Sequence, residues 1–287
     1  MTEYDQIKKR AFYIAIFVSL ILTVFKLTSG YITNTWSVVT MGMDSFMDIL
    51  FTNFNFLMLR VSDTPADKNH PAGHGKFESF AVVIQSVIIF LLGNFMMYKG
   101  ISDFYNDIHP VFSPFVIGVM GFSVLGSIVI SYNLRKAGKL TNSDALIADS
   151  AHYTVDIVSN GAIMLGLLGG YIWGLDHADA ILNSVFSVMI IISSIKLFIP
   201  AFKILTDYKV PDEIFLQFKS IMDNNRDIKG YHSLFVVRNG SFLLFSVHIE
   251  LDKNMSLYDS HLIADDLEKK IKLEILNSKP TIHVDPV

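Results

Sequence analysis

The sequence predicts an α-helical membrane protein with six transmembrane helices, followed by a small α+β domain of the ferredoxin-like kind. Three observations support this fold class. Of the 287 residues, 51% are hydrophobic and only 17% are charged, which is too apolar for an ordinary soluble domain. The apolar residues gather in six long stretches. After Asp207 the pattern changes to short elements that contain charges.

Each of the six apolar stretches is long enough to cross a bilayer, whose hydrocarbon core requires about 20 helical residues. They cover residues 11–32, 36–60, 79–103, 111–134, 144–172 and 178–204. No short apolar core with a small-residue cleavage site follows the polar residues 1–10, so we interpret the first stretch as a retained helix rather than a signal peptide. We expect a membrane domain over residues 1–207 and a separate domain over residues 208–287.

The positions of lysine and arginine predict the orientation in the membrane. The loops near 33–35, 104–110 and 173–177 contain neither residue, whereas the alternate loops and both ends of the chain do. Because positive residues stay on the cytoplasmic side, we expect both termini in the cytoplasm. The basic residues concerned are Lys8, Lys9, Arg10, Arg60, Lys68, Lys76, Arg135, Lys136, Lys139, Lys203 and Lys209. The chain has no cysteine, which excludes disulfides and thiolate metal sites.

The last part of the chain predicts a helix, two strands, a helix and a strand. We expect these elements over residues 211–224, 232–238, 241–251, 256–275 and 280–285. Asn239 and Gly240 between two β-rich segments are a strong hairpin signal. This order of elements favours a small α+β layer close to the ferredoxin-like arrangement.

Two aspartates interrupt the second apolar stretch. Asp44 and Asp48 stand four residues apart and therefore share one face of the helix. An ionised carboxylate at membrane depth is costly unless it faces protein, water or a cation, and two adjacent carboxylates also repel each other. A structural pair of protonated or hydrogen-bonded aspartates is the alternative to a cation site.

The fifth apolar stretch repeats this spacing with His152 and Asp156. If the two helix faces meet, three carboxylates and one imidazole come together. Four oxygen and nitrogen ligands suit a tetrahedral divalent cation, above all zinc, and the imidazole favours zinc or ferrous iron over magnesium, calcium and manganese. Asp149, one turn earlier, ranks lower as a ligand and is expected to support the others or to line the helix.

Two further groups of histidines lie outside the apolar stretches. Asp67, His70 and His74 follow the second stretch at spacings of three and four, and they would converge if the segment were partly helical. Pro71 weakens the helix argument, and solvated histidines are the alternative. The C-terminal domain contains five side chains that can bind a cation at one or two sites, with scattered surface histidines as the alternative. They are His232, His248, His261, His283 and Asp285.

Five motifs together resemble the cation diffusion facilitator family, specifically its bacterial zinc- and iron-efflux branch. The motifs are "DSFMD", "DKNHPAGHGKFES", "DALIADSAHYTVD", "GLDHADAI" and "IHVDP", and the resemblance covers nearly the whole chain. It implies a homodimer with six helices per subunit and a cytoplasmic, metallochaperone-like domain. It also implies exchange of a divalent cation for protons.

The resemblance also implies roles for particular residues. The transport site would consist of Asp44, Asp48, His152 and Asp156. The loop site would consist of Asp67, His70 and His74. The cytoplasmic binuclear site at the dimer interface would consist of His232, His248, His261, His283 and Asp285. Lys76 and Asp207 match the pair that locks the membrane and cytoplasmic parts of the dimer together.

The sequence thus predicts a transporter that exports zinc in exchange for protons, with iron(II) or cadmium as other cargo and further zinc ions in a regulatory role. We expect a multi-pass protein of the bacterial inner membrane, surrounded by lipid, without a nucleic acid partner. An intramembrane metallohydrolase would require an open coordination position and a general base, and no HExxH motif is present, so we do not expect an enzyme. A metal-gated channel or a metal sensor without coupled transport is the alternative that remains.

Overall fold

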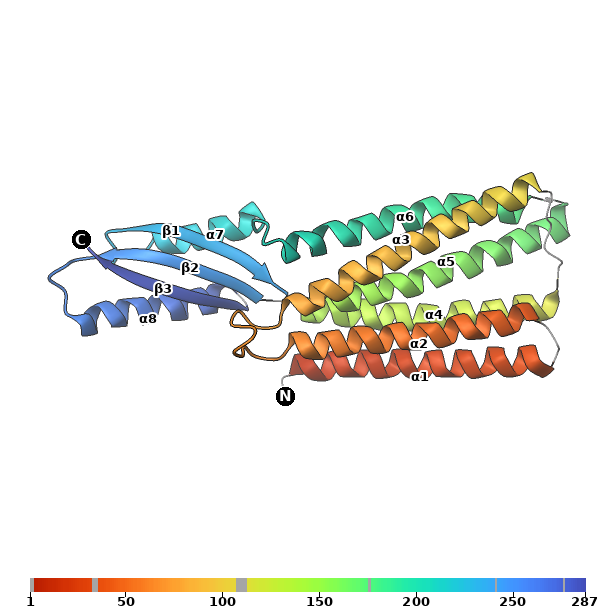
Figure 1. Ribbon diagram of the computed structural model, residues 1–287, viewed down its shortest axis with the longest axis horizontal. Coiled ribbons are helices and arrows are strands. Elements are labelled where there is room, and N and C mark those ends of the chain that lie inside the picture. The colour runs from red at the N-terminus through yellow and green to blue at the C-terminus, as the bar shows by residue number, and fades with distance from the viewer. Residues whose placement is uncertain (1–2, 33–35, 107–112, 175–176, 241, 276) are drawn as a thin grey trace. The chain divides into compact units, whose positions relative to one another are not determined.

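The structure is a computed structural model, and it describes residues 3–32, 36–106, 113–174, 177–240, 242–275 and 277–287 (Figure 1). The contacts within it divide the chain into two compact units. The first unit comprises Met1–Val61 and Phe77–Ala201, and the second comprises Ser62–Lys76 and Phe202–Val287. The loop after the second helix therefore belongs to the same unit as the C-terminal elements.

All six predicted long helices are present. They are α1 (Glu3–Ile32), α2 (Trp36–Ser62), α3 (Lys76–Tyr105), α4 (Pro114–Thr141), α5 (Asp144–Trp173) and α6 (Ala178–Leu205). Among the described residues, five of these helices are long and apolar enough to cross a membrane. The exception is α2, which is 27 residues long but contains two aspartates, two asparagines and an arginine that lower its hydropathy. The predicted fold class is confirmed, and the two aspartates among the candidate ligands contribute to the lower hydropathy of α2.

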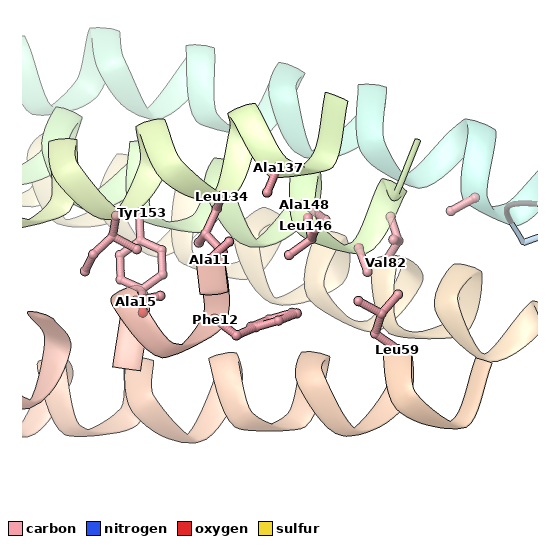
Figure 2. Close-up of a cluster of buried hydrophobic side chains, with 13 residues drawn as sticks. Ala11, Phe12, Ala15, Leu59, Val82, Leu134, Ala137, Leu146, Ala148 and Tyr153 are labelled. Atoms are coloured by element: carbon pink, nitrogen blue, oxygen red, sulfur yellow. The ribbon is translucent and has the colours of Figure 1, made fainter. Parts of the chain in front are cut away.

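The core of the first unit combines large apolar side chains with alanines, which let the helices approach closely. Figure 2 shows Phe12 and two alanines of α1 facing residues of α4 and α5. Tyr153 and Phe12 are among the largest side chains with no more than 1% of their surface exposed. At Gly126 of α4, an added Cβ would lie 2.8 Å from Cδ1 of Leu22, so a larger residue here would require the side chain of Leu22 on α1 to shift.

A buried carboxylate fixes the start of α5. Ser143 caps the helix, and its hydroxyl donates a hydrogen bond of 2.6 Å to Oε1 of Glu78 on α3. The backbone N–H of Ala145 donates to the same oxygen at 3.2 Å. Because the first N–H groups of a helix have no partner within it, a negative charge here is favourable. Glu78 thus anchors the helix that contains His152 and Asp156.

The second unit has the predicted order of helices and strands. It contains α7 (Asp212–Asp223), β1 (Gly230–Asn239), β2 (Phe242–Leu251), α8 (Leu257–Glu274) and β3 (Ser278–Pro286). The strands lie in the order β1-β2-β3, with β1 and β2 antiparallel and β2 and β3 parallel. Gly240 at the hairpin has a φ of +60°, a conformation that glycine adopts without strain. The ferredoxin-like expectation for this domain is confirmed.

The three-stranded sheet has one face packed on the helices. Alternate residues of β2, including Val247 and Ile249, are buried in a cluster with Phe218 of α7 and with Leu267 and Ile271 of α8. Because neighbouring side chains of a strand point to opposite faces, His248 and Glu250 lie on the other face. The histidines of the sheet are therefore on the face that these two helices leave uncovered.

Candidate metal centres

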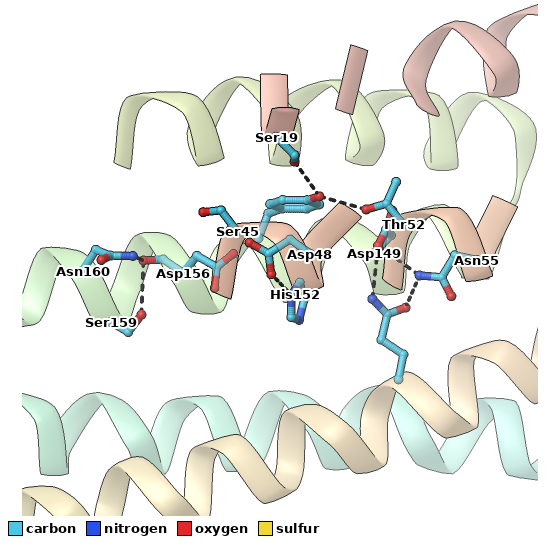
Figure 3. A network of polar contacts seen from close by, with 12 residues as sticks. Ser19, Ser45, Asp48, Thr52, Asn55, Asp149, His152, Asp156, Ser159 and Asn160 are labelled. Carbon is cyan, nitrogen blue, oxygen red and sulfur yellow. Dashed lines mark hydrogen bonds and ion pairs between the residues drawn. The ribbon is translucent and has the colours of Figure 1, made fainter. Parts of the chain in front are cut away.

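The group inside the membrane helices consists of Asp48 from α2 with His152 and Asp156 from α5. One ligand atom of each lies within 4.8 Å of the others. Nε2 of His152 and Oδ1 of Asp48 are 2.9 Å apart, a hydrogen bond whose donor depends on the protonation of the pair. Figure 3 shows the three side chains directed toward one another. Oδ2 of Asp156 is buried and has no hydrogen-bond partner among the described residues, so it is available to a cation.

Asp44 is not part of this group. It lies on α2, one turn before Asp48, and is exposed. Four residues advance a helix by about 6 Å and rotate it by about 40°, which displaces Asp44 from the position of Asp48. The structure therefore brings together three of the four residues that the sequence predicts for this site.

Asp149 lies in a separate polar network on the same helix. It is fully buried, and its Oδ1 accepts hydrogen bonds from the amides of Asn55 at 2.9 Å and Gln85 at 3.3 Å. The two amides are joined by a hydrogen bond of 3.0 Å. That Asp149 supports the ligands or lines the helix therefore stays a prediction. Sequence reasoning missed Asn55 and Gln85, although each is a polar residue in an apolar stretch, which was an available signal.

Tyr153 connects three helices next to His152. Its hydroxyl lies 3.0 Å from Oγ of Ser19 on α1 and 2.8 Å from Oγ1 of Thr52 on α2. The ring of Tyr153 meets the imidazole of His152 edge-on, with 5.7 Å between the ring centres. Tyr153 therefore links α1, α2 and α5 beside the imidazole of His152.

Lys26 is a further residue that sequence reasoning missed. Only 5% of this lysine is exposed, and its ammonium donates a hydrogen bond of 2.8 Å to Oγ of Ser45. Ser45 stands between Asp44 and Asp48 on α2. A lysine within the apolar segment "TVFKLTSG" was the signal that could have identified it.

The predicted loop group comes together without a helix. His70 Nδ1 is 3.4 Å from Oδ1 of Asp67, and His74 Nε2 is 3.6 Å from its Oδ2. The carboxylate of Asp67 accepts the backbone N–H groups of Asn69 and His70 at 2.8 and 2.7 Å, which turns the chain back on itself. The N–H of His70 is the main cause that lowers the pKa of Asp67. Pro71 is accommodated because an aspartate turn, rather than a helix, produces the convergence.

The loop is packed on the hairpin of its own unit. The amide of Asn239 donates a hydrogen bond of 2.9 Å to the carbonyl of Ala72. A Cβ at Gly240 would overlap the backbone of Gly75, so the two glycines permit this approach. The position of the loop group is thus fixed by the turn between β1 and β2.

The third group lies on the uncovered face of the sheet. Ligand atoms of His232, His248 and Asp285 are within 4.8 Å of one another. The strand register produces this group, because His232 is opposite His248 and His248 is opposite His283. Oδ2 of Asp285 is 3.1 Å from Nδ1 of His248 and 3.3 Å from Nε2 of His232.

Two more side chains border this group. His283 Nε2 is 3.3 Å from Oδ1 of Asp285, and its ring centre is 4.5 Å from that of His248. Oε1 of Glu250 is 3.3 Å from Nδ1 of His232. Sequence reasoning did not select Glu250 as a ligand, although it stands two residues after His248 and so on the same face of the strand. The sheet face thus offers three imidazoles and two carboxylates, a donor set that suits zinc.

His261 is apart from the other histidines within one chain. It lies on α8, its side chain is 71% exposed, and its Nε2 is 3.7 Å from Oδ2 of Asp265. Because α8 packs on the opposite face of the sheet, His261 does not reach the group around His248 in the same chain. The two remaining predicted residues, Lys76 and Asp207, form an ion pair in the second unit.

Comparisons with known proteins cover nearly the whole chain. Residues 12–206 match the family described as the cation efflux transmembrane domain, and residues 210–287 match the cation efflux protein cytoplasmic domain. The first match includes α2, which contains Asp44 and Asp48.

Relatives match over similar lengths. The cation-efflux pump FieF of Cronobacter sakazakii is 30% identical over 285 residues, which cover 99% of this chain and 94% of the relative. FieF of Pectobacterium atrosepticum is 31% identical over 274 residues, which cover 94% and 90% of the two chains. Protein p34 of Rickettsia rickettsii is 28% identical over 283 residues, which cover 98% and 93%.

Proposed function

Because this chain belongs to the cation diffusion facilitator family of cation efflux proteins, we propose that it exports a divalent transition-metal cation in exchange for protons. The chain is a multi-pass membrane transporter and not an enzyme. Zinc is the proposed cargo, with iron(II) and cadmium as the next candidates. We infer that it works as a homodimer in the bacterial inner membrane with both termini in the cytoplasm.

The group of Asp48, His152 and Asp156 is the observation that carries this proposal. Ligand atoms at about 2 Å from a tetrahedral zinc ion are about 3.3 Å from one another. The three donor atoms all lie within 4.8 Å of one another, and the Nε2 of His152 is 2.9 Å from the Oδ1 of Asp48. The imidazole in the donor set is the reason for preferring zinc or iron(II) to manganese. Asp44 would complete the coordination after a local shift of α2 or of its own side chain.

Proton exchange follows from the chemistry of these ligands. Carboxylates and imidazole bind a metal only in their deprotonated forms, so loading releases protons. The hydrogen bond between His152 and Asp48 holds a proton where the cation would bind both residues. Alternating access would expose the loaded site to the outer side, where protons compete with the metal for the same atoms.

The two groups of the second unit are proposed as regulatory zinc sites. His232, His248 and Asp285 lie on a sheet face that α7 and α8 do not cover. A second subunit facing this surface would add ligands, and we propose the His261 of that subunit as one of them. Zinc bound here would stabilise the dimer. The loop group of Asp67, His70 and His74 offers one carboxylate and two imidazoles to such an ion.

Flux measurements on reconstituted vesicles test the proposal. Purified protein in proteoliposomes should move zinc against its own gradient when a pH gradient is imposed, and zinc should produce an opposite movement of protons. Vesicles without protein are the control for leak. A metal-gated channel would let zinc move only down its gradient, whatever the pH gradient. A sensor would bind zinc and produce no flux, so either result would contradict coupled export.

A further inference from the structure

A β-bulge interrupts β1 directly after His232. The antiparallel pairing of β1 with β2 changes register between His232 and Phe235. Two residues of β1, Ser233 and Leu234, therefore stand where a regular strand would have one. Ser233 has a φ of +54°, in the left-handed region that residues other than glycine seldom adopt. Such a conformation persists only where the surrounding structure holds it in place.

The side chains on either side of Ser233 show what holds the bulge. Tyr231 and Leu234 both pack against the buried apolar cluster of this domain. The hydroxyl of Tyr231 also donates a hydrogen bond of 2.7 Å to Oδ1 of Asp223, the last residue of α7. Because side chains alternate between the two faces, residues three apart point to opposite faces of a regular strand. One extra residue between Tyr231 and Leu234 lets both of them face the core.

The same extra residue determines the direction of His232. If the regular pairing of the hairpin continued, Ser233 would be opposite His248 and His232 would be opposite Ile249. Ile249 has none of its surface exposed, and residues directly opposite each other share one face, so the imidazole would enter the core. With the bulge, His232 is opposite His248 instead, and its Nε2 lies 3.3 Å from Oδ2 of Asp285.

We propose that Ser233 is a positioning residue of the zinc group formed by His232, His248 and Asp285. It is the extra residue of the bulge, and it turns His232 onto the uncovered face of the sheet without touching the metal itself. The pairing of β2 with β3 is regular, so His248 and Asp285 need no such device. This inference rests on the proposed function, since it assumes that zinc binds at this group.

Zinc calorimetry on the full chain in detergent tests the inference. The background carries His70→Ala and Asp156→Ala, which each remove a ligand from one of the other two groups. The readout is the loss of zinc affinity that His232→Ala causes, because this loss measures whether the imidazole reaches the metal. In the parent chain it should be about tenfold or more. Ser233→Gly adopts the same φ without strain and should leave that loss unchanged.

Two other changes at Ser233 should have opposite effects. Ser233→Val introduces a β-branched residue that disfavours positive φ, so regular pairing should turn His232 into the core. Zinc affinity should fall about tenfold, and adding His232→Ala should then lower it by less than about twofold. Ser246→Val is the control, because it makes the same substitution at a regular position of β2 and should behave as the parent does.

Deletion of Ser233 is the sharper test. Removing one residue from a regular strand reverses the faces of all residues beyond it. Here the deletion should remove only the bulge, leaving Leu234 opposite Val247 and His232 opposite His248. The deletion variant should therefore fold, bind zinc and lose as much affinity on His232→Ala as the parent does.

Three outcomes would overturn the inference. They are a full loss on His232→Ala in the Ser233→Val chain, no loss in the deletion variant, and failure of the deletion variant to fold. If Ser233→Val does not fold, the deletion variant decides alone. Failure of the zinc group itself would look different. His248→Ala and Asp285→Ala would then leave zinc binding unchanged, whereas a failed inference about Ser233 leaves their losses intact.

Discussion

The ammonium of Lys76 lies 2.7 Å from Oδ2 of Asp207. Its Nζ is also 3.5 Å from the carbonyl of Leu205, the last residue of α6. The carbonyls at the end of a helix have no partner within it, so a positive charge is favourable there. The two side chains are 37% and 50% exposed, and such a pair contributes about 0–1 kcal/mol within a single chain.

We predict that Lys76→Ala and Asp207→Ala each weaken the dimer or slow zinc flux. The double exchange, Lys76→Asp with Asp207→Lys, should restore part of the loss. A double-mutant cycle on dimer dissociation, measured by analytical ultracentrifugation, gives the coupling energy. The exposed pair Lys209–Asp212, 2.9 Å apart, is the matched control. A coupling above about 1 kcal/mol would indicate enclosure between subunits, and a value of zero would assign both residues to the solvated surface.

Asp48→Ala and Asp156→Ala should each abolish zinc flux while the protein stays folded and dimeric. Each aspartate supplies a negative charge that a cation inside the membrane requires. Uptake by proteoliposomes measures the flux, and size-exclusion chromatography checks the dimer. Asp103→Ala removes a carboxylate paired with Lys99 and is the control that should retain flux. Normal zinc uptake by either variant would refute the assignment of the transport site.

His152→Asp should shift selectivity toward manganese or cadmium. The substitution replaces a nitrogen ligand with oxygen, and an all-oxygen site is harder and accepts larger ions. Uptake of paired metals in competition measures the order of preference. His152→Gln is the control, because it removes the imidazole without adding a carboxylate. An unchanged order in His152→Asp would mean that other residues determine selectivity.

Replacing both His232 and His283 with alanine should weaken the cytoplasmic dimer without emptying the membrane site. Residues 208–287 include the whole apolar core of this domain, so the fragment can be studied alone. Calorimetry should detect zinc binding to it at neutral pH and weaker binding in acid, because protons compete for the imidazoles. Binding should change less in His261→Ala, which lies outside the group in one chain. A fragment without zinc affinity at neutral pH would rule out the group.

The turn at Asp67 should depend on pH in a defined direction. The backbone N–H of His70 lowers the pKa of this aspartate, so its folded pKa lies below the unfolded value of about 3.9. Its contribution is therefore fully present above that value and is lost as the pH falls through the lower folded pKa. Hydrogen exchange at the amide of His70 measures the turn. Exchange should be faster in Asp67→Ala at neutral pH, and equal protection in both proteins would contradict the assigned role.

The sequence by itself determined the helices and the order of the C-terminal elements. A run of about 20 apolar residues can satisfy its backbone in a bilayer only as a helix, so residues 144–172 predicted α5 without any tertiary information. The Asn239-Gly240 turn likewise located the hairpin through local backbone preference. The four-residue spacing of His152 and Asp156 placed both on one helix face. Each of these signals comes from residues that are close together in the sequence.

Only the tertiary structure decided which side chains meet. Asp48 pairs with His152 while Asp44 does not, because the rotation of α2 against α5 is set by packing between segments about a hundred residues apart. The alignment of His232, His248 and His283 depends on strand register, which a shift of one residue would destroy. Lys26 is an isolated charge in the sequence, and its hydrogen bond to Ser45 arises only when α1 packs on α2. These contacts are non-local, so no short sequence pattern encodes them.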